Sequence, residues 1–276
     1  MGTSGSYEGP GNGNPLIPSW LEAPAAPVGA APQAAPGLVP PQPLTPQPNR
    51  FTAPRTNFSR FATSGGRDRA ALGRAIRAYV SSSSGGSQTA SQRMGAARPV
   101  AGQLLNFWAQ GIREGAQAAL RAVNLEALAD RPLEEVFLAL ADVICPDGAT
   151  LDEAIARNAF IDTVVDLPSV GITTLEFSPT ELRLVLELYI AHSIEARLCN
   201  DIGANTLILP RDVAAAANVQ AQVWDFVRRG VSDALAPLEG TLHAIGPHGV
   251  TPFIARLYGE AFAVLGAMGD QIAGTT

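Results

Sequence analysis

The chain has 276 residues, of which 46% are hydrophobic and 16% are charged, and its formal net charge is −6 at pH 7. This hydrophobic content suffices for a folded core, and the length fits one large domain or two small ones. No run of about 18 uncharged apolar residues occurs, so no membrane-spanning helix is expected. The sequence shows no secretory leader, and Cys145 and Cys199 lie far apart. We therefore expect a cytoplasmic protein without a disulfide framework.

Charge divides the chain into three segments. Residues 1–49 contain two acids and no base, residues 50–98 contain nine arginines and one aspartate, and residues 99–276 contain ten arginines and 22 acids. All 19 basic residues are arginine, and lysine is absent. The negative net charge therefore conceals a basic middle segment next to an acidic C-terminal segment.

Residues 1–49 are predicted to be a long disordered Pro/Gly-rich N-terminal tail. They hold 12 of the 22 prolines and few bulky side chains. Such a segment cannot bury enough apolar surface to offset the entropy cost of ordering. One apolar island interrupts it, and its bulky members are Leu16, Ile17, Trp20 and Leu21. This island suggests a docking motif for a partner, and an apolar run without a role is the alternative.

The remainder is predicted to be an all-α, multi-helix domain. In residues 50–98, apolar residues at helical spacing indicate one helix, from Arg67 onward to about Val80, and a Ser/Gly turn at residues 81–87 ends it. In residues 99–276, the predicted helices cover residues 99–120, 132–144, 151 onward, 179–198, 212–235 and 252–272. Strand-like alternation is limited to residues 171–177 and 206–209, which are weak candidates.

Polar residues mark where three of these helices begin. Thr150 with Glu153 and Ser178 with Glu181 have the spacing of capping boxes. Thr251 precedes Pro252 and is the predicted N-cap of the last helix.

No residues in the sequence combine into a recognisable catalytic or metal site. His192 lies in an apolar helical pattern and is expected to be packed. His243 and His248 flank a predicted loop at residues 245–247 and lack a third ligand for zinc. A P-loop needs a lysine, which this chain does not have. We therefore expect no enzymatic activity, no metal ion and no cofactor of the protein's own.

The arginine-rich segment admits several interpretations. Arg74, Arg77 and Arg93, together with the Ser/Gly turn, are candidate anion-binding residues. Three phenylalanines interleave with the arginines as candidate base-stacking platforms for nucleic acid: Phe51, Phe58 and Phe61. We favour a third interpretation, in which the arginines pair with the acidic segment, within the chain or between subunits.

The N-terminal amine is chemically distinctive. Gly2 is small, so removal of Met1 is expected, and it would leave a glycine α-amine. With a pKa of about 7.7–8.0, part of this amine is unprotonated at neutral pH, whereas a lysine amine near pKa 10.4 is almost fully protonated. A GC-rich genome accounts for the missing lysine, but the α-amine is still the only aliphatic amine. Gly2 and Ser6 also fit a myristoylation pattern, but the basic neighbours that would support membrane anchoring are absent.

Short motifs in the first hundred residues resemble those of a known bacterial family. They include MGTS at 1–4, GP at 9–10, PLIPSW at 15–20, SGG at 64–66, GGS at 85–87 and RMG at 93–95. On these motifs the chain resembles the QatB component of the four-gene Qat anti-phage system. The resemblance implies a role in bacterial defence, beside a QueC-like enzyme (QatC), an ATPase and a TatD-like nuclease as partners.

The resemblance also implies a chemical role for the N-terminus. QueC enzymes use ATP to activate the carboxylate of a 7-carboxy-7-deazaguanine, which an amine then attacks to form an amide. The QueC-like partner is expected to use ATP, zinc and a 7-deazaguanine, and Gly2 is the predicted conjugation site. The predicted partner-binding residues are Thr3, Ser4, Gly5, Ser6, Leu16, Ile17, Trp20 and Leu21. The alternatives are a nucleic-acid-binding module that uses residues 50–98, or a purely structural scaffold.

Overall fold

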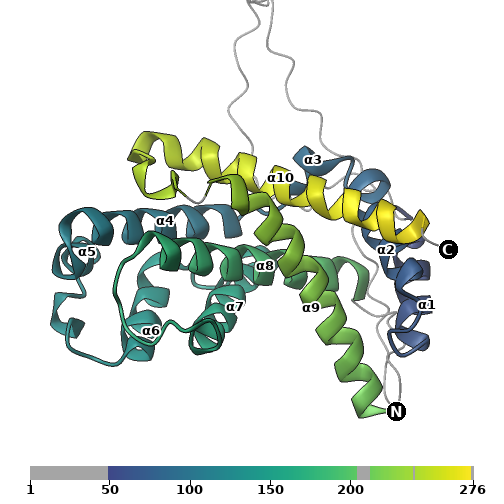
Figure 1. The fold of residues 1–276 in the computed structure, drawn as a ribbon, viewed down its shortest axis with the longest axis horizontal. Coiled ribbons are helices and arrows are strands. Elements are labelled where there is room, and N and C mark those ends of the chain that lie inside the picture. Colours follow the sequence, from purple (N-terminus) through teal and green to yellow (C-terminus); the bar gives the residue numbers. More distant parts are fainter. Residues whose placement is uncertain (1–48, 204–211, 239, 275–276) are drawn as a thin grey trace, which may run out of the picture. The chain divides into compact units, whose positions relative to one another are not determined.

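The computed structural model describes residues 49–203, 212–238 and 240–274, which belong to one compact unit, Gln47–Thr276. The described residues contain helices and no strand, so the all-α prediction is confirmed (Figure 1). The weak strand candidate at residues 171–177 is therefore wrong, and the one at 206–209 lies outside the described residues. The tail and its docking motif, within residues 1–48, lie outside them too.

The helices follow one another with short connections. The described α-helices are α1 (Thr52–Thr63), α2 (Arg69–Ala78), α3 (Ser87–Gln92), α4 (Ala97–Glu114), α5 (Ala116–Ala122), α6 (Leu133–Ile144), α7 (Leu151–Asp166), α8 (Pro179–Gly203), α9 (Val213–Leu235) and α10 (Pro247–Gly274). The shorter helical turns are η2 (Tyr79–Ser83), η3 (Glu126–Leu128), η4 (Leu167–Val170), η5 (Ala236–Leu238) and η6 (Leu242–Ala244).

The basic segment contains more helix than the sequence analysis expected. Helix α1 was not predicted; its Pro54 lies in the first turn, where proline removes no hydrogen bond, and Phe58 and Phe61 are buried. The Ser/Gly turn begins later than expected, because α2 continues as the π-helical turn η2 through Ser83. The chain breaks only at Gly85 and Gly86, whose φ angles of 79° and 98° favour glycine.

The start of α10 is a second correction. The helix begins at Pro247, five residues before the predicted start, so Thr251 is not its N-cap. Pro247, the last residue of the predicted loop, is the first residue of the helix, and His248 lies in its first turn. Pro247 suits the first helical position, where its missing N–H costs nothing. Pro252 lies inside the helix. Burial of Val250 and Phe253 on either side of it favours a continuous helix despite the lost hydrogen bond.

The described core is built around α8 and α10. Helix α8 packs against α4, α7 and α9, and Tyr189 and Ile190 in its middle are fully buried. Helix α10 packs against α2, α3, α4 and α9 (Figure 1). Gly73 of α2 and Gly269 of α10 bring the two backbones so close that an added Cβ would clash with a carbonyl oxygen, at 2.6 and 2.7 Å. The basic segment is thus an integral part of the helical unit.

Candidate functional site

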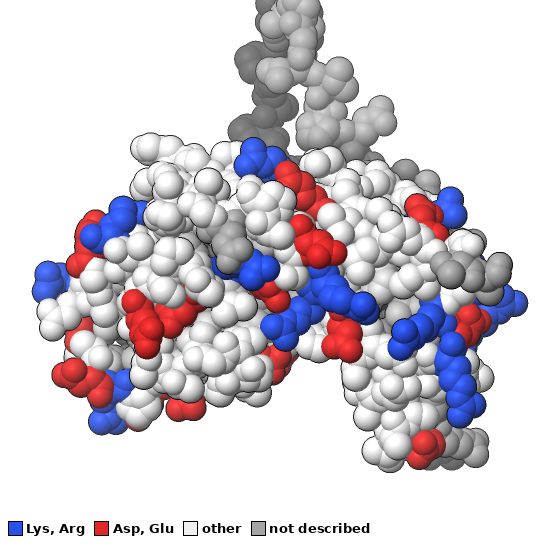
Figure 2. Space-filling model, viewed as in Figure 1, with Lys and Arg blue, Asp and Glu red and all other residues white. Residues whose placement is uncertain are grey.

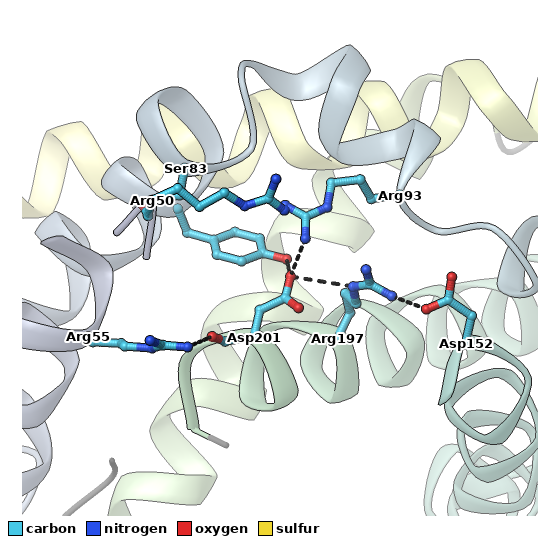
Figure 3. A network of polar contacts seen from close by, with 8 residues as sticks. Arg50, Arg55, Ser83, Arg93, Asp152, Arg197 and Asp201 are labelled. Carbon is cyan, nitrogen blue, oxygen red and sulfur yellow. Dashed lines mark hydrogen bonds and ion pairs between the residues drawn. The ribbon is translucent and has the colours of Figure 1, made fainter. Parts of the chain in front are cut away.

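A polar network surrounds Asp201, near the end of α8 (Figure 3). The carboxylate of Asp201 is 8% exposed and accepts three hydrogen bonds. The donors are the Tyr79 hydroxyl at 2.9 Å, the Arg93 guanidinium at 3.2 Å and Nε of Arg197 at 3.4 Å. A buried carboxylate is tolerated where cations and donors surround it in this way.

Further contacts join four elements to this centre. Arg197 also pairs with Asp152 in the first turn of α7, and Arg55 of α1 donates a hydrogen bond of 3.0 Å to the carbonyl of Asp201. Tyr79 comes from η2, and Arg93 follows α3 directly. These partners lie far apart along the chain, so the network fixes the basic segment to α7 and α8.

The network also fixes the first described residues. The ring of Phe51 stacks on Tyr79 with centroids 5.8 Å apart. Three guanidinium groups lie over the Phe51 ring: Arg50 at 4.7 Å, Arg93 at 5.1 Å and Arg55 at 5.8 Å from the centroid. Ser83 donates a hydrogen bond to the carbonyl of Arg50, and Figure 3 shows the Arg50 and Arg93 side chains extending toward each other. The residues that directly follow positions 1–48 are therefore held in place.

The electrostatics suit a structural role for the network. Burial raises the pKa of Tyr79, and Asp201 raises it further, so the hydroxyl remains protonated as a donor. Burial lowers the pKa of Arg93, while Asp201 opposes this. Burial also lowers the pKa of Arg197, but Asp201 and Asp152 outweigh it and the net direction is upward.

The three candidate anion-binding arginines do not share one site. Each is paired with a different carboxylate: Arg74 with Asp68 at 3.7 Å, Arg77 with Asp270 at 2.8 Å and Arg93 with Asp201. Two of these acids lie in the C-terminal segment, in agreement with the favoured interpretation that the basic segment pairs with it. On the face seen in Figure 2, positive and negative side chains are interspersed.

The proposed base-stacking platforms are largely unavailable. Phe58 is 4% exposed and Phe61 is fully buried, so the prediction is wrong for both. Phe51 is half-buried and already covered by arginines. Sequence alone could not show this, because it depends on how α1 packs within the domain.

The histidines and cysteines form no metal site in the described part of the chain. His192 is packed as expected: its ring stacks on Trp224 with centroids 4.1 Å apart, and its Nε2 lies 3.1 Å from Asp166. Burial lowers the pKa of His192, whereas Asp166 opposes this effect. Burial raises the pKa of Cys145 to about 11, so this thiol is protonated at neutral pH, whereas Cys199 is exposed. Within the described ranges, no helix has the length and apolarity that crossing a membrane requires.

Together the described residues define an all-helical protein with a buried arginine–carboxylate network. A family model described as QatB, Qat anti-phage system associated protein, matches residues 85–265. This match covers more than half of the chain, so the protein belongs to the QatB family. The match runs from just before α3 into α10, whereas most motifs that suggested the family precede it. No curated protein and no solved structure matches the chain.

Proposed function

We propose that this protein is a non-catalytic component of the Qat defence system that binds the QueC-like enzyme and presents its N-terminal glycine for conjugation to a 7-deazaguanine. Membership of the QatB family supports the role in anti-phage defence. The observation that carries the finer proposal is the absence of lysine, which leaves the α-amine of Gly2, after removal of Met1, as the only aliphatic amine.

The chemistry requires an amine that is unprotonated and accessible. The partner activates the carboxyl group of the deazaguanine with ATP, and the Gly2 nitrogen then attacks the carbonyl carbon. A C–N bond forms, the nucleotide leaves with the electron pair of the broken bond, and the nitrogen loses one proton. The α-amine suits this step because its pKa is close to neutral. The ATP and zinc belong to the partner in this proposal, and this protein supplies only the nucleophile.

The network around Asp201 supports the presentation of this amine. It holds Arg50 and Phe51, which closely follow positions 1–48, against η2 and Arg93. A disordered segment of 48 residues would span about 40 Å from such a fixed base. The small residues Thr3, Ser4, Gly5 and Ser6 would enter the active site of the partner.

The N-terminal peptide of protein co-expressed with its QueC-like partner provides the test. We expect its mass to rise by one deazaguanine acyl group. Gly2→Ala keeps a primary amine and should still be modified, whereas Gly2→Pro yields a secondary amine and should not be. An unshifted wild-type peptide in the presence of an active partner would contradict the proposal.

A variant with an added lysine tests why the N-terminal amine would be modified. The partner could recognise the tail, or it could modify the N-terminus only because the chain has no other aliphatic amine. Val213 is 82% exposed at the start of α9, so Val213→Lys adds an accessible amine away from the N-terminus. We expect modification to remain at the N-terminal peptide. Equal modification at position 213 would show that the partner does not select the tail.

The apolar island is the proposed anchor for the partner. Leu16, Ile17, Trp20 and Leu21 would each contribute about 1.5–3 kcal/mol if buried at the interface. Trp20→Ala should therefore weaken binding of the QueC-like enzyme about tenfold or more in a titration. Unchanged affinity in the Trp20→Ala and Leu16→Ala variants would exclude the island as the anchor.

A further inference from the structure

An open cavity of about 340 Å³ is lined by α4 and the first turns of α10, and most of its lining residues are exposed at the surface. The two helices pack against each other (Figure 1). Its walls carry four polar side chains, those of Arg98, Gln103, Asn106 and Thr251, and no lining residue is acidic. The rest of the lining is apolar or glycine: Gly95, Pro99, Gly102, Pro247 and Val250. The volume lies within the range of small-molecule sites in proteins.

Arg98 is a cation without a partner in the described structure. It is half-buried, and its Nε atom is fully buried without a hydrogen-bond acceptor. Among the described residues no carboxylate pairs with its guanidinium. The carboxylate of Asp152 approaches Gly95 at the cavity edge, but it is paired with Arg197. Because no described carboxylate neutralises its guanidinium, Arg98, which lines the cavity, is available to an anion that enters it.

The position of Arg98 in its helix adds to the positive electrostatic potential of the cavity. It lies in the first turn of α4, which contains no acidic residue, and a cation at this end of a helix is disfavoured by the helix dipole. The first turn of α10 also contains no acid and contributes Pro247 and Val250 to the same cavity. A cation, a polar lining and two helix N-termini therefore converge where no carboxylate offsets them.

We propose that this cavity binds the phosphate group of a small phosphorylated molecule, for which AMP serves as the probe. Arg98 would pair with the phosphate, and the side chains of Gln103, Asn106 and Thr251 would donate hydrogen bonds to its oxygens. Pro99 and Val250 would contact the remainder of the molecule. This site lies in the helical domain and is independent of the proposed conjugation at Gly2.

Isothermal titration of the full chain tests the proposal with three probes: AMP, inorganic phosphate and adenosine. We expect AMP to bind at one site, phosphate to bind more weakly, and adenosine to bind at least about tenfold more weakly than AMP. Arg98→Gln should weaken AMP binding at least about tenfold. The control is Arg256→Gln on α10, because Arg256 is exposed, pairs with Glu260 and does not line the cavity.

Thermal unfolding separates a ligand-binding role of Arg98 from a packing role. Because the cation is unpartnered and lies at the unfavourable end of α4, Arg98→Gln should raise the Tm of the free protein by about 1–3 °C. Asn106→Ala changes a second residue of the cavity lining, and it should weaken the binding of AMP several-fold. The proposal is overturned if AMP and phosphate both fail to bind at about 10 mM, if adenosine binds as tightly as AMP, or if Arg98→Gln binds AMP unchanged.

Discussion

Arg93 and Arg98 lie five residues apart, yet only Arg93 has an acidic partner among the described residues. Arg93 is 15% exposed, pairs with Asp201 and lies over the ring of Phe51. Arg98 is half-buried and has no acidic partner among the described residues. The first arginine joins the basic segment to α8 and stabilises the fold. The second adds an unfavourable charge, which is typical of residues kept for binding rather than for stability.

Glu195 is the acidic counterpart of Arg98. It lies on α8, half-buried, and burial raises its pKa to about 7, with further increases from Asp162 and Asp166 on α7. Among the described residues, the charges around Asp201 are therefore paired, whereas Arg98 and Glu195 have no partner of opposite charge. The difference is measurable, because removing a paired charge should destabilise the protein and removing an unpaired one should not.

The largest effect is expected from Asp201→Ala. It would leave Arg93, Arg197 and the Tyr79 hydroxyl without their shared acceptor, at a cost of about 3–5 kcal/mol in the free energy of unfolding. The matched control is Asp270→Ala, whose ion pair with Arg77 is more than half exposed and should contribute less than about 1 kcal/mol. Urea unfolding measures both, and equal losses would show that the network has no special role.

Arg93→Gln should have a smaller effect in the same direction. The variant loses one charge-assisted hydrogen bond and the contact with Phe51, but Arg197 and Tyr79 still contact Asp201. We expect a loss of about 1.5–3 kcal/mol, again measured by urea unfolding. If Arg93→Gln lowered the free energy of unfolding as much as Asp201→Ala does, Arg93 alone would compensate the buried charge of the Asp201 carboxylate.

Glu195→Gln should stabilise the protein at pH 8 by about 1–3 kcal/mol. Because the pKa of Glu195 is raised above its ordinary value of 4.5, the folded state binds more protons than the unfolded state between pH 4.5 and about 7. Its contribution to stability is therefore fully present below pH 4.5 and is lost as pH rises through 7. His192 acts in the opposite direction, because burial lowers its pKa.

Unfolding at pH 4 and pH 8 checks this expectation. The difference between Glu195→Gln and the wild type should disappear at pH 4, where Glu195 is protonated in both states. Glu260→Gln, at an exposed ion pair, is the control. A difference that does not change between the two pH values would contradict the proposed cause.

The smallest effect is expected from Arg98→Gln without ligand, a gain of about 0.3–1 kcal/mol, since it removes a cation from the first turn of α4. Differential scanning calorimetry would detect it. The sign of the change in the free energy of unfolding distinguishes the two arginines. If Arg98→Gln destabilised the protein as Arg93→Gln does, both arginines would support the fold.

Features that depend on neighbouring residues were predictable. The capping boxes at Thr150 and Ser178 form as expected, and Asp212, where the predicted helix at residues 212–235 begins, caps α9. A cap requires only a side chain and a backbone N–H three residues away. The start of α10 was not predictable in this way, because the position of Pro252 suggested a local start, whereas burial of Val250 and Phe253 favoured a longer helix.

The sequence by itself determined the helical class, most helix positions and the absence of lysine on which the proposed conjugation depends. Only the tertiary structure decided which charges are paired. Tyr79 and Asp201 are 122 residues apart, and no local pattern links them. In the same way, nothing near Arg98 in the sequence shows that it has no acidic partner in the described part of the chain. Local structure follows from short-range sterics and hydrogen bonds, whereas charge pairing depends on how distant helices pack.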